Sequence, residues 1–359
     1  LLAWTDRGLG ELSRLYHRFV RRNICRGPWR FVRRPVLINN WEATYFDFDT
    51  DKILHIAEKA AGLGVELMVL DDGWFGQRND DNSSLGDWQV NTRKLPGGLD
   101  PLIERIHALG MKFGIWVEPE MVSIDSDLYR AHPDWALTLP GRQPAMGRNQ
   151  LVLDMARPEV VDYLAGLLTA LLRDHAIDYV KWDMNRNMSD VYSRALPPER
   201  QGEAAHRYML GVYSLLERLT QAFPQVLFEG CAGGGGRFDC GMLAYFPQIW
   251  CSDDTDAVER LTIQHGTSFG YPVSAMGAHV SACPNHQTGR TVPLGTRAVV
   301  AMSGTFGYEL DLNRLTPEEC DAVRGQIEQF KRWAGLIGGG DYFRLAPPET
   351  GDFTAWQFT

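Results

Sequence analysis

Short apolar runs rich in β-branched residues alternate with segments of helical period along most of the chain, and this alternation restricts the fold more than any other feature. The runs that predict strands are 36–41, 65–70, 112–117, 151–155, 177–182, 226–229, 248–251 and 273–276. The segments that predict the following helices lie near 51–63, 99–109, 126–131, 158–175, 202–222, 240–246, 256–266 and 294–304. Eight such units favour an α/β fold of the (β/α)8 TIM-barrel type over an open doubly wound sheet, which usually has fewer strands.

The two flanks of this segment differ from it. Residues 1–35 predict a short N-terminal helical lead-in, and the barrel is expected over 36–340, with a further amphipathic helix near 316–336. Residues 341–359 end in an alternating pattern and predict the beginning of a truncated C-terminal β domain. The arginine run within the lead-in fits an anionic partner or, as is commoner for charge runs, a solvated helix face. Because the first residue is Leu1, we expect the chain to start inside a longer reading frame.

Charge and hydropathy exclude several classes of function. The 359 residues carry a net charge of −9, which argues against a general nucleic-acid binder. No apolar run reaches about 18 residues, so the sequence predicts no membrane span. The six cysteines include no C-x-x-C pair, and their low density favours a reducing compartment. We therefore expect a cytoplasmic protein.

Acidic and other polar residues crowd the carboxyl ends of the predicted strands, where the active sites of barrel enzymes lie. A single Asp after a strand is commonly a helix N-cap, but acids at five strand ends favour a carboxylate-lined pocket. The polar residues at these five ends are Asp71 and Asp72; Glu118 and Glu120; Lys181, Asp183 and Asn185; Glu229 and Cys231; and Asp253, Asp254 and Asp256.

Strand periodicity narrows the choice among these acids. Lys181, Asp183 and Asn185 fall on one face of a strand, because side chains at i, i+2 and i+4 share a face. The ammonium group of Lys181 would favour an ionised Asp183 that could act as a nucleophile, and the alternative is a purely structural ion pair. Only one of the neighbours Asp253 and Asp254 can face the pocket.

Tryptophan and phenylalanine side chains accompany the acids. Such residues usually pack in the core, but next to carboxylates at strand ends they also suit the apolar face of a sugar ring. Carboxylates would accept hydrogen bonds from the sugar hydroxyls, so the combination favours a carbohydrate ligand. The aromatic residues in question are Trp41, Trp74, Phe75, Trp116 and Trp182.

Other chemistries have weaker support. The nine histidines are scattered, and only His279 and His286 fall near a strand end, so no metal site is predicted, although a carboxylate-rich Mg²⁺ site stays an alternative. The run 233–236 is four glycines without a phosphate-loop pattern, and it predicts a tight turn where backbone approaches a ligand. Cys231 could line the pocket. Three other cysteines, Cys240, Cys251 and Cys283, are expected to be buried. No cofactor is expected.

Five motifs in order along the chain closely resemble those of the α-galactosidases of glycoside hydrolase family 36. They are Asp-Asp-Gly-Trp-Phe at 71–75, Trp-Val-Glu-Pro-Glu at 116–120, Lys-Trp-Asp-Met-Asn-Arg at 181–186, Glu-Gly-Cys-Ala followed by four glycines, Arg and Phe at 229–238, and Ser-Asp-Asp-Thr-Asp at 252–256. The resemblance extends from about residue 4 to the C-terminal tail. It implies a retaining mechanism with two carboxylates.

The resemblance also implies a role for individual residues. Asp183 matches the nucleophile, and Asp253 matches the general acid/base. The residues that match substrate-binding positions are Asp71 and Asp72, on the hydroxyls far from C1; Lys181, a further hydroxyl donor; Asn185, in the motif of the nucleophile; Cys231 and Gly233, beside O2; and Arg148, Trp116 and Trp41.

Two departures from the family pattern bear on the expected activity. Asp254 stands where relatives often have Asn, and a carboxylate there could raise the pKa of Asp253. The resemblance implies a large N-terminal β-sandwich and a C-terminal β domain, and we expect the first and most of the second to lie outside this sequence. We expect an exo-acting α-galactosidase acting on α-galactoside oligosaccharides such as melibiose and raffinose, homo-oligomeric as the full-length protein. The alternatives are a galactosyl-transferring relative, an α-N-acetylgalactosaminidase and a non-catalytic sugar-binding fragment.

Overall fold

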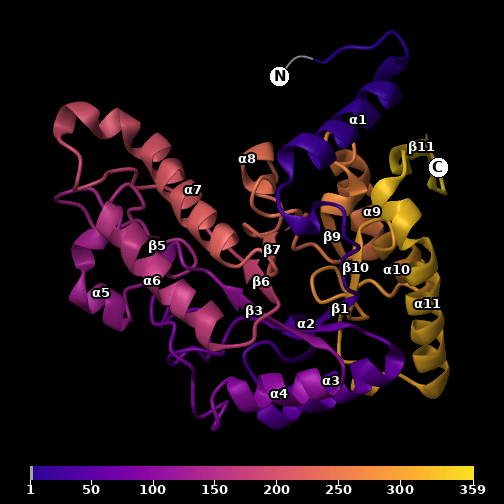
Figure 1. The fold of residues 1–359 in the computed structure, drawn as a ribbon, viewed down its shortest axis with the longest axis horizontal. Helices are drawn as coiled ribbons and strands as arrows, with labels where there is room; N and C mark the ends of the chain where they lie inside the picture. Colours follow the sequence, from indigo (N-terminus) through magenta and orange to yellow (C-terminus); the bar gives the residue numbers. More distant parts are fainter. Residues whose placement is uncertain (1–2) are drawn as a thin grey trace.

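Eight parallel strands close into a barrel in this computed structural model, which describes residues 3–359 (Figure 1). In order round the barrel the strands are β1 (Leu37–Asn39), β2 (Leu67–Leu70), β3 (Lys112–Val117), β6 (Tyr179–Trp182), β7 (Leu227–Gly230), β8 (Gln248–Trp250), β9 (Met276–Ser281) and β10 (Thr305–Glu309). The last strand pairs with the first, with Leu37 opposite Gly307, and so closes the ring. The predicted (β/α)8 fold is confirmed.

Helices follow the strands and cover the outside of the barrel (Figure 1). Their ends carry ordinary capping signals: the Asp49 carboxylate accepts the N–H of Lys52 at the start of α3, and Gly64 ends α3 with a φ of 94°. The helices are α2 (Trp41–Thr44), α3 (Thr50–Leu63), α4 (Asp100–Ala108), α5 (Asp127–Ala131), α6 (Pro158–Asp174), α7 (Ala204–Ala222), α8 (Cys240–Leu243), α9 (Ala257–Thr267), α10 (Leu294–Ala301) and α11 (Pro317–Gly339).

The strand predicted at 151–155 is not part of the barrel, so that assignment was wrong. Its observed counterpart, β5 (Gln150–Val152), pairs antiparallel with β4 (Met121–Ser123) in a separate two-stranded sheet. Strand β3 pairs directly with β6. A short apolar run predicts a buried strand but does not say which sheet the strand joins. The two-stranded β4–β5 sheet is therefore an insertion between the third and fourth barrel strands.

The eighth barrel strand is β10, which the sequence pattern did not reveal. The run predicted at 273–276 falls on a 3₁₀ turn (Val273–Ala275) that precedes β9. Gly307 lies inside β10 because a Cβ there would lie 2.8 Å from the His279 ring and 2.9 Å from Leu37. Glycine weakens a strand pattern, and this hid the strand from sequence analysis.

The lead-in closes the N-terminal end of the barrel. Trp29 packs against a cluster of barrel residues, and its Nε1 donates to the backbone oxygen of Gln225 at 2.9 Å. Arg34 is buried and donates to the backbone oxygen of Pro247 at 3.0 Å. The side chains of the cluster are Leu37, Leu67, Val69, Tyr179 and Leu227. The lead-in thus seals the end of the barrel opposite the predicted pocket.

The two ends of the described chain contact each other. Helix α1 (Gly8–Phe19) lies beside the antiparallel pair β11 (Tyr342–Ala346) and β12 (Ala355–Phe358), and Arg18 forms an ion pair with Asp341 (Figure 1). No helix between residues 3 and 359 combines the length and hydropathy of a membrane-spanning segment. The expected domain limits, cytoplasmic location and homo-oligomeric state stay predictions.

Candidate active site

A cavity of about 180 Å³ opens at the carboxyl ends of the barrel strands. All of the residues that the family resemblance matched to catalytic or substrate-binding positions line it except Cys231 and Gly233, which brings together side chains more than 200 positions apart in sequence. Five of the strand-end acids expected in the pocket do not line it: Glu118, Glu120, Glu229, Asp254 and Asp256. The predicted residues that line the cavity are Trp41, Asp71, Asp72, Trp116, Arg148, Lys181, Asp183, Asn185 and Asp253. The other lining residues are Glu42, Trp250, Thr255, His286, Gln287 and Glu309.

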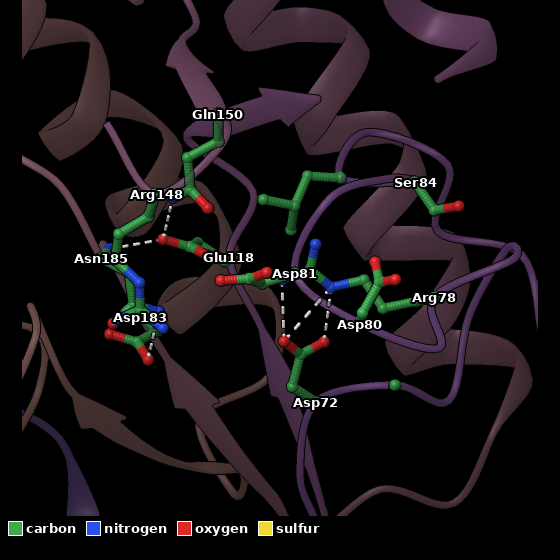
Figure 2. Close-up of polar contacts among 12 residues, drawn as sticks. Asp72, Arg78, Asp80, Asp81, Ser84, Glu118, Arg148, Gln150, Asp183 and Asn185 are labelled. Atoms are coloured by element: carbon green, nitrogen blue, oxygen red, sulfur yellow. Dashed lines mark hydrogen bonds and ion pairs between the residues drawn. The ribbon is translucent and has the colours of Figure 1, made fainter. Parts of the chain in front are cut away.

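Asp183 follows strand β6 and is 5% exposed. Its Oδ2 accepts hydrogen bonds from Nε1 of Trp116 at 3.1 Å and from Nδ2 of Asn185 at 2.8 Å, and its Oδ1 accepts the backbone N–H of Met184 at 2.9 Å. Three donors from two strand ends therefore fix the orientation of this carboxylate. Figure 2 shows the contact with Asn185. The alternation predicted for 181, 183 and 185 is confirmed, since all three side chains line the cavity.

Lys181 forms its ion pair with Asp71 and not, as the sequence analysis suggested, with Asp183. Its Nζ lies 2.9 Å from Oδ2 of Asp71, and Asn39 donates to the same oxygen. Burial lowers the pKa of Lys181, but the carboxylates of Asp71 and Glu309 outweigh burial and hold that pKa well above its ordinary value. The cavity therefore presents a permanently charged donor beside an acceptor that is already oriented.

Asp72 is held by Arg78, a residue that sequence analysis missed. Nη2 of Arg78 lies 2.9 Å from Oδ2 of Asp72, and its Nε lies 3.0 Å from Oδ1 (Figure 2). Both side chains are buried, and burial raises the pKa of Asp72 in spite of the guanidinium. Arg78 lies in a loop that follows β2, so no strand-end pattern marks it.

Asp253 reaches the cavity from the loop after β8. Its Oδ1 accepts a hydrogen bond from Nε1 of Trp250 at 3.1 Å. Burial, followed by the negative charge of Asp183, raises the pKa of Asp253 to about 6. Asp254 is not a leading cause of that shift: it does not line the cavity, and its Oδ1 accepts the backbone N–H of Asp256. Asp256 caps helix α9, as a single Asp after a strand commonly does.

The four-glycine turn supports the loop that carries Asp253. A Cβ on Gly234 would lie 2.7 Å from the backbone nitrogen of Asp253, and one on Gly235 would lie 2.5 Å from the backbone oxygen of Cys251. These contacts explain Gly234 and Gly235, whose backbone packs against another loop, and the predicted approach of the turn to a ligand stays a prediction. Gly233 has a φ of 54° and no atom within 4 Å of a Cβ position.

Cys231 lies at the floor of the site without lining the cavity. It is buried, and burial and the carboxylates of Asp183 and Asp253 raise the pKa of its thiol well above the ordinary value. The thiol is therefore neutral. The prediction of buried cysteines holds for Cys251 but is wrong for Cys240 and Cys283, which are exposed.

Two further acids line the cavity. Glu309 ends strand β10 and lies 3.0 Å from Nδ1 of His279, and Glu42 of helix α2 lies 3.3 Å from Nδ1 of His286. Sequence analysis missed Glu309 because it missed strand β10. Glu42 could have been predicted, because it directly follows Trp41 and is an acid just after the first strand. Among the described residues no group of three His, Cys, Asp or Glu side chains is arranged to hold a metal ion.

Of the aromatic residues predicted to face a sugar, Trp41 and Trp116 line the cavity. Trp74, Phe75 and Trp182 are instead fully buried in the core. Trp250 joins the cavity from β8, where the sequence analysis considered it only as part of a strand. The cavity thus combines carboxylates, one ammonium, one guanidinium and three indole rings.

Comparison with known proteins identifies the class that this fold and site define. The melibiase family matches residues 1–340, and the chain belongs to that family. It is 56% identical over 358 residues to the alpha-galactosidase AgaA of Geobacillus stearothermophilus, covering 100% of this chain and 49% of that protein. It is also 56% identical to the bifunctional alpha-galactosidase/sucrose kinase AgaSK of Mediterraneibacter gnavus, covering 99% of this chain and 37% of that protein.

Solved structures agree with these matches. The crystal structure of the GH36 alpha-galactosidase AgaA superposes with a TM-score of 0.98 at 57% identity, covering 99% of this chain and 49% of the other. Structures of AgaA variants have been determined in complex with raffinose and with stachyose. The chain spans about half the length of AgaA and 37% of the length of AgaSK.

Proposed function

We propose that this chain forms the catalytic barrel of a retaining exo-α-galactosidase that releases terminal α-linked galactose from oligosaccharides such as melibiose and raffinose. One observation carries the proposal: Asp183, oriented by three donors, and Asp253, with its pKa raised to about 6, line one cavity. Family membership and the raffinose and stachyose complexes of AgaA variants support the substrate class.

In the first step of the proposed reaction Asp183 attacks C1 of the galactose. The bond between C1 and the glycosidic oxygen breaks, an ester between C1 and Asp183 forms, and protonated Asp253 gives its proton to the leaving oxygen. Because Asp253 has a pKa of about 6, a large fraction of it is protonated in mildly acidic solution.

In the second step Asp253 acts as a base. Esterification removes the negative charge of Asp183, which is the second cause of the raised pKa of Asp253. The pKa of Asp253 therefore falls when the intermediate forms, which favours removal of a proton from water. Water attacks C1, the ester breaks, and Asp253 receives the proton. A retaining enzyme would hold the two carboxyl groups about 5–5.5 Å apart.

The remaining lining residues suit recognition of one sugar ring. Asp71 and Asp72 present oriented acceptors, Lys181 presents a donor, and Trp41 and Trp116 offer apolar faces for the ring. The cavity volume of about 180 Å³ lies below the roughly 300–1,000 Å³ of sites for drug-sized ligands. A small site favours an exo-acting enzyme that binds a terminal galactose.

The test is release of nitrophenol from the aryl α-galactoside, α-glucoside and N-acetyl-α-galactosaminide. The purified protein should turn over the galactoside alone, and Asp183→Ala should lower that rate by about 10⁴-fold or more, since removing a nucleophile leaves only binding and electrostatic effects. Faster turnover of the N-acetyl substrate would reassign the specificity. Sugar binding in calorimetry without turnover would support the non-catalytic alternative.

A further inference from the structure

Glu118 is a fully buried carboxyl group at the end of strand β3 that the proposed reaction does not use. Its Oε1 accepts the backbone N–H of Asn185 and a hydrogen bond from Nε2 of Gln150 at 2.8 Å (Figure 2). Gln150 belongs to β5 and is itself buried. One carboxyl oxygen therefore connects the inserted β4–β5 sheet with the loop that follows the nucleophile.

Asn185 carries this contact to Asp183. Its Nδ2 donates to Oδ2 of Asp183 at 2.8 Å, and its Oδ1 accepts from Nη1 of Arg148 at 3.0 Å (Figure 2). The peptide N–H of the same residue is held by Glu118. The bond to Glu118 holds the backbone of Asn185 in place. It thereby fixes the direction from which Nδ2 of Asn185 donates to the Asp183 carboxylate.

The surroundings of Glu118 disfavour a charge on it. Oε2 is buried and has no hydrogen-bond partner among residues 3–359, and none of the ion pairs between described residues includes Glu118. Burial, followed by the negative charge of Asp183, raises the pKa of Glu118 well above its ordinary value. A neutral carboxyl group still accepts both N–H groups through Oε1 and adds no negative charge next to Asp183.

Glu120, two residues further on, shows the opposite arrangement. It is also fully buried, but Arg237 lies 2.8 Å from its Oε1, and Trp182 and Tyr208 also donate to it. Burial raises the pKa of Glu120, yet Arg237 and these donors outweigh burial and lower it overall. The difference between the two acids therefore comes from their partners and not from their depth.

We propose that Glu118 is a positioning residue that acts on Asp183 through Asn185, as an uncharged acceptor. It does not touch the reacting atoms. This inference rests on the proposed function, because it assigns Asp183 the part of nucleophile.

Two substitutions of Glu118 separate its shape from its charge. Glu118→Gln keeps the length of the side chain and a carbonyl acceptor, so kcat on the aryl α-galactoside should stay within about threefold of the unaltered protein. Glu118→Asp withdraws the acceptor by one carbon–carbon bond, about 1.5 Å. Its kcat should fall about 10- to 100-fold, with KM within about twofold, since an error of about 1 Å in a catalytic group costs on the order of 10².

A double-mutant cycle tests whether the effect passes through Asn185. Asn185→Ala should itself lower kcat about tenfold. Glu118→Asp in that background should lower kcat by less than about threefold more, because residues that act in one chain of contacts are not additive.

Crystal structures of the Glu118 variants distinguish failure of this inference from failure of the proposed function. The contact between Asn185 and Asp183 should persist in Glu118→Gln and lengthen in Glu118→Asp, whether or not the protein hydrolyses a galactoside. The inference is overturned if Glu118→Gln loses as much kcat as Glu118→Asp, since a charge would then be required. It is also overturned if Glu118→Asp leaves kcat and the contact intact, or if the cycle is additive.

Discussion

The two carboxylates proposed to carry the reaction differ in what surrounds them. Asp183 accepts three N–H donors, whereas Asp253 accepts one from Trp250 and lies in a buried site near other acids. Environments that push two carboxyl groups toward different protonation states are the usual basis for dividing a reaction between a nucleophile and an acid.

Glu309 should contribute to the pH dependence of the reaction through its effect on Asp253. Its carboxylate is one of the groups that raise the pKa of Asp253, so Glu309→Gln should lower that pKa. Activity on raffinose, whose leaving oxygen needs a proton, should fall as the pH rises through about 6, where Asp253 loses its proton. In Glu309→Gln this alkaline limb of kcat/KM should move to lower pH by about half a unit, on the order of 0.7 kcal/mol.

The control for this pH profile is Glu217→Gln, which removes a partly exposed acid that pairs with Arg26 away from the cavity. It should leave the alkaline limb in place. An unmoved limb in Glu309→Gln would show that the titrating group is not Asp253.

Arg78 should matter more to stability than any exposed arginine. Arg78→Ala leaves the Asp72 carboxylate buried without its cation, and breaking a buried pair in this way costs about 3–5 kcal/mol. Arg26→Ala breaks an exposed pair with Glu217 and should cost at most about 1 kcal/mol. Urea unfolding of both variants measures the difference. Equal losses would mean that Asp72 finds another partner or a proton.

Some site residues could be predicted from the sequence and others could not. Asp71 and Asp183 directly follow strands whose apolar patterns are strong, and Lys181 lies within one of these strands, so their common location follows from the barrel alone. Arg78 lies in an irregular segment that no pattern marks. Arg148 lies in another, and only the family resemblance indicated it. The tertiary structure alone shows which carboxylate or amide each of them meets.

At the scale of elements, the order of strands was predictable only where each strand had a continuous apolar pattern. The β5 run looks like a barrel strand but pairs with β4, and β10 contains a glycine that the approach of Leu37 and His279 requires. Both errors arise because strand pairing is decided by contacts distant in sequence. The predicted number of eight barrel strands was right, because one strand was wrongly included, the run at 151–155, and one was missed, β10.

The glycine turn after β7 should position the loop that carries Asp253. Gly235→Ala places a Cβ about 2.5 Å from the backbone oxygen of Cys251, so one of the two loops must shift. A shift of about 1 Å at a catalytic group is expected to lower kcat on the order of 10²-fold. Assays with the aryl α-galactoside measure this loss.

Gly166→Ala is the matched control for that substitution. Gly166 lies in helix α6, and nothing lies within 4 Å of a Cβ there. Alanine should leave kcat unchanged and stabilise the helix by roughly 0.5–1 kcal/mol. Retention of full activity in Gly235→Ala would show that the turn does not set the position of Asp253.

At the scale of the molecule, the lead-in and the cavity lie at opposite ends of the barrel. Trp29→Ala should therefore lower the free energy of unfolding by about 1–3 kcal/mol, because apolar contact with the N-terminal end of the barrel is lost. It should leave KM and kcat at low temperature unchanged. Thermal unfolding and steady-state kinetics on the same sample check both parts. A large change in kcat with no loss of stability would contradict the view that the lead-in stabilises the barrel without acting on the cavity.

We assign Asp183 as the nucleophile and Asp253 as the acid/base of a double displacement. The most direct measurement is the anomeric configuration, by NMR, of the galactosyl azide that each variant forms from an activated aryl α-galactoside and azide. Asp183→Ala should give the β-azide, by direct displacement. Asp253→Ala should give the α-azide, because azide then replaces water in attack on the galactosyl ester. The opposite assignment, or the same anomer from both variants, would contradict the account.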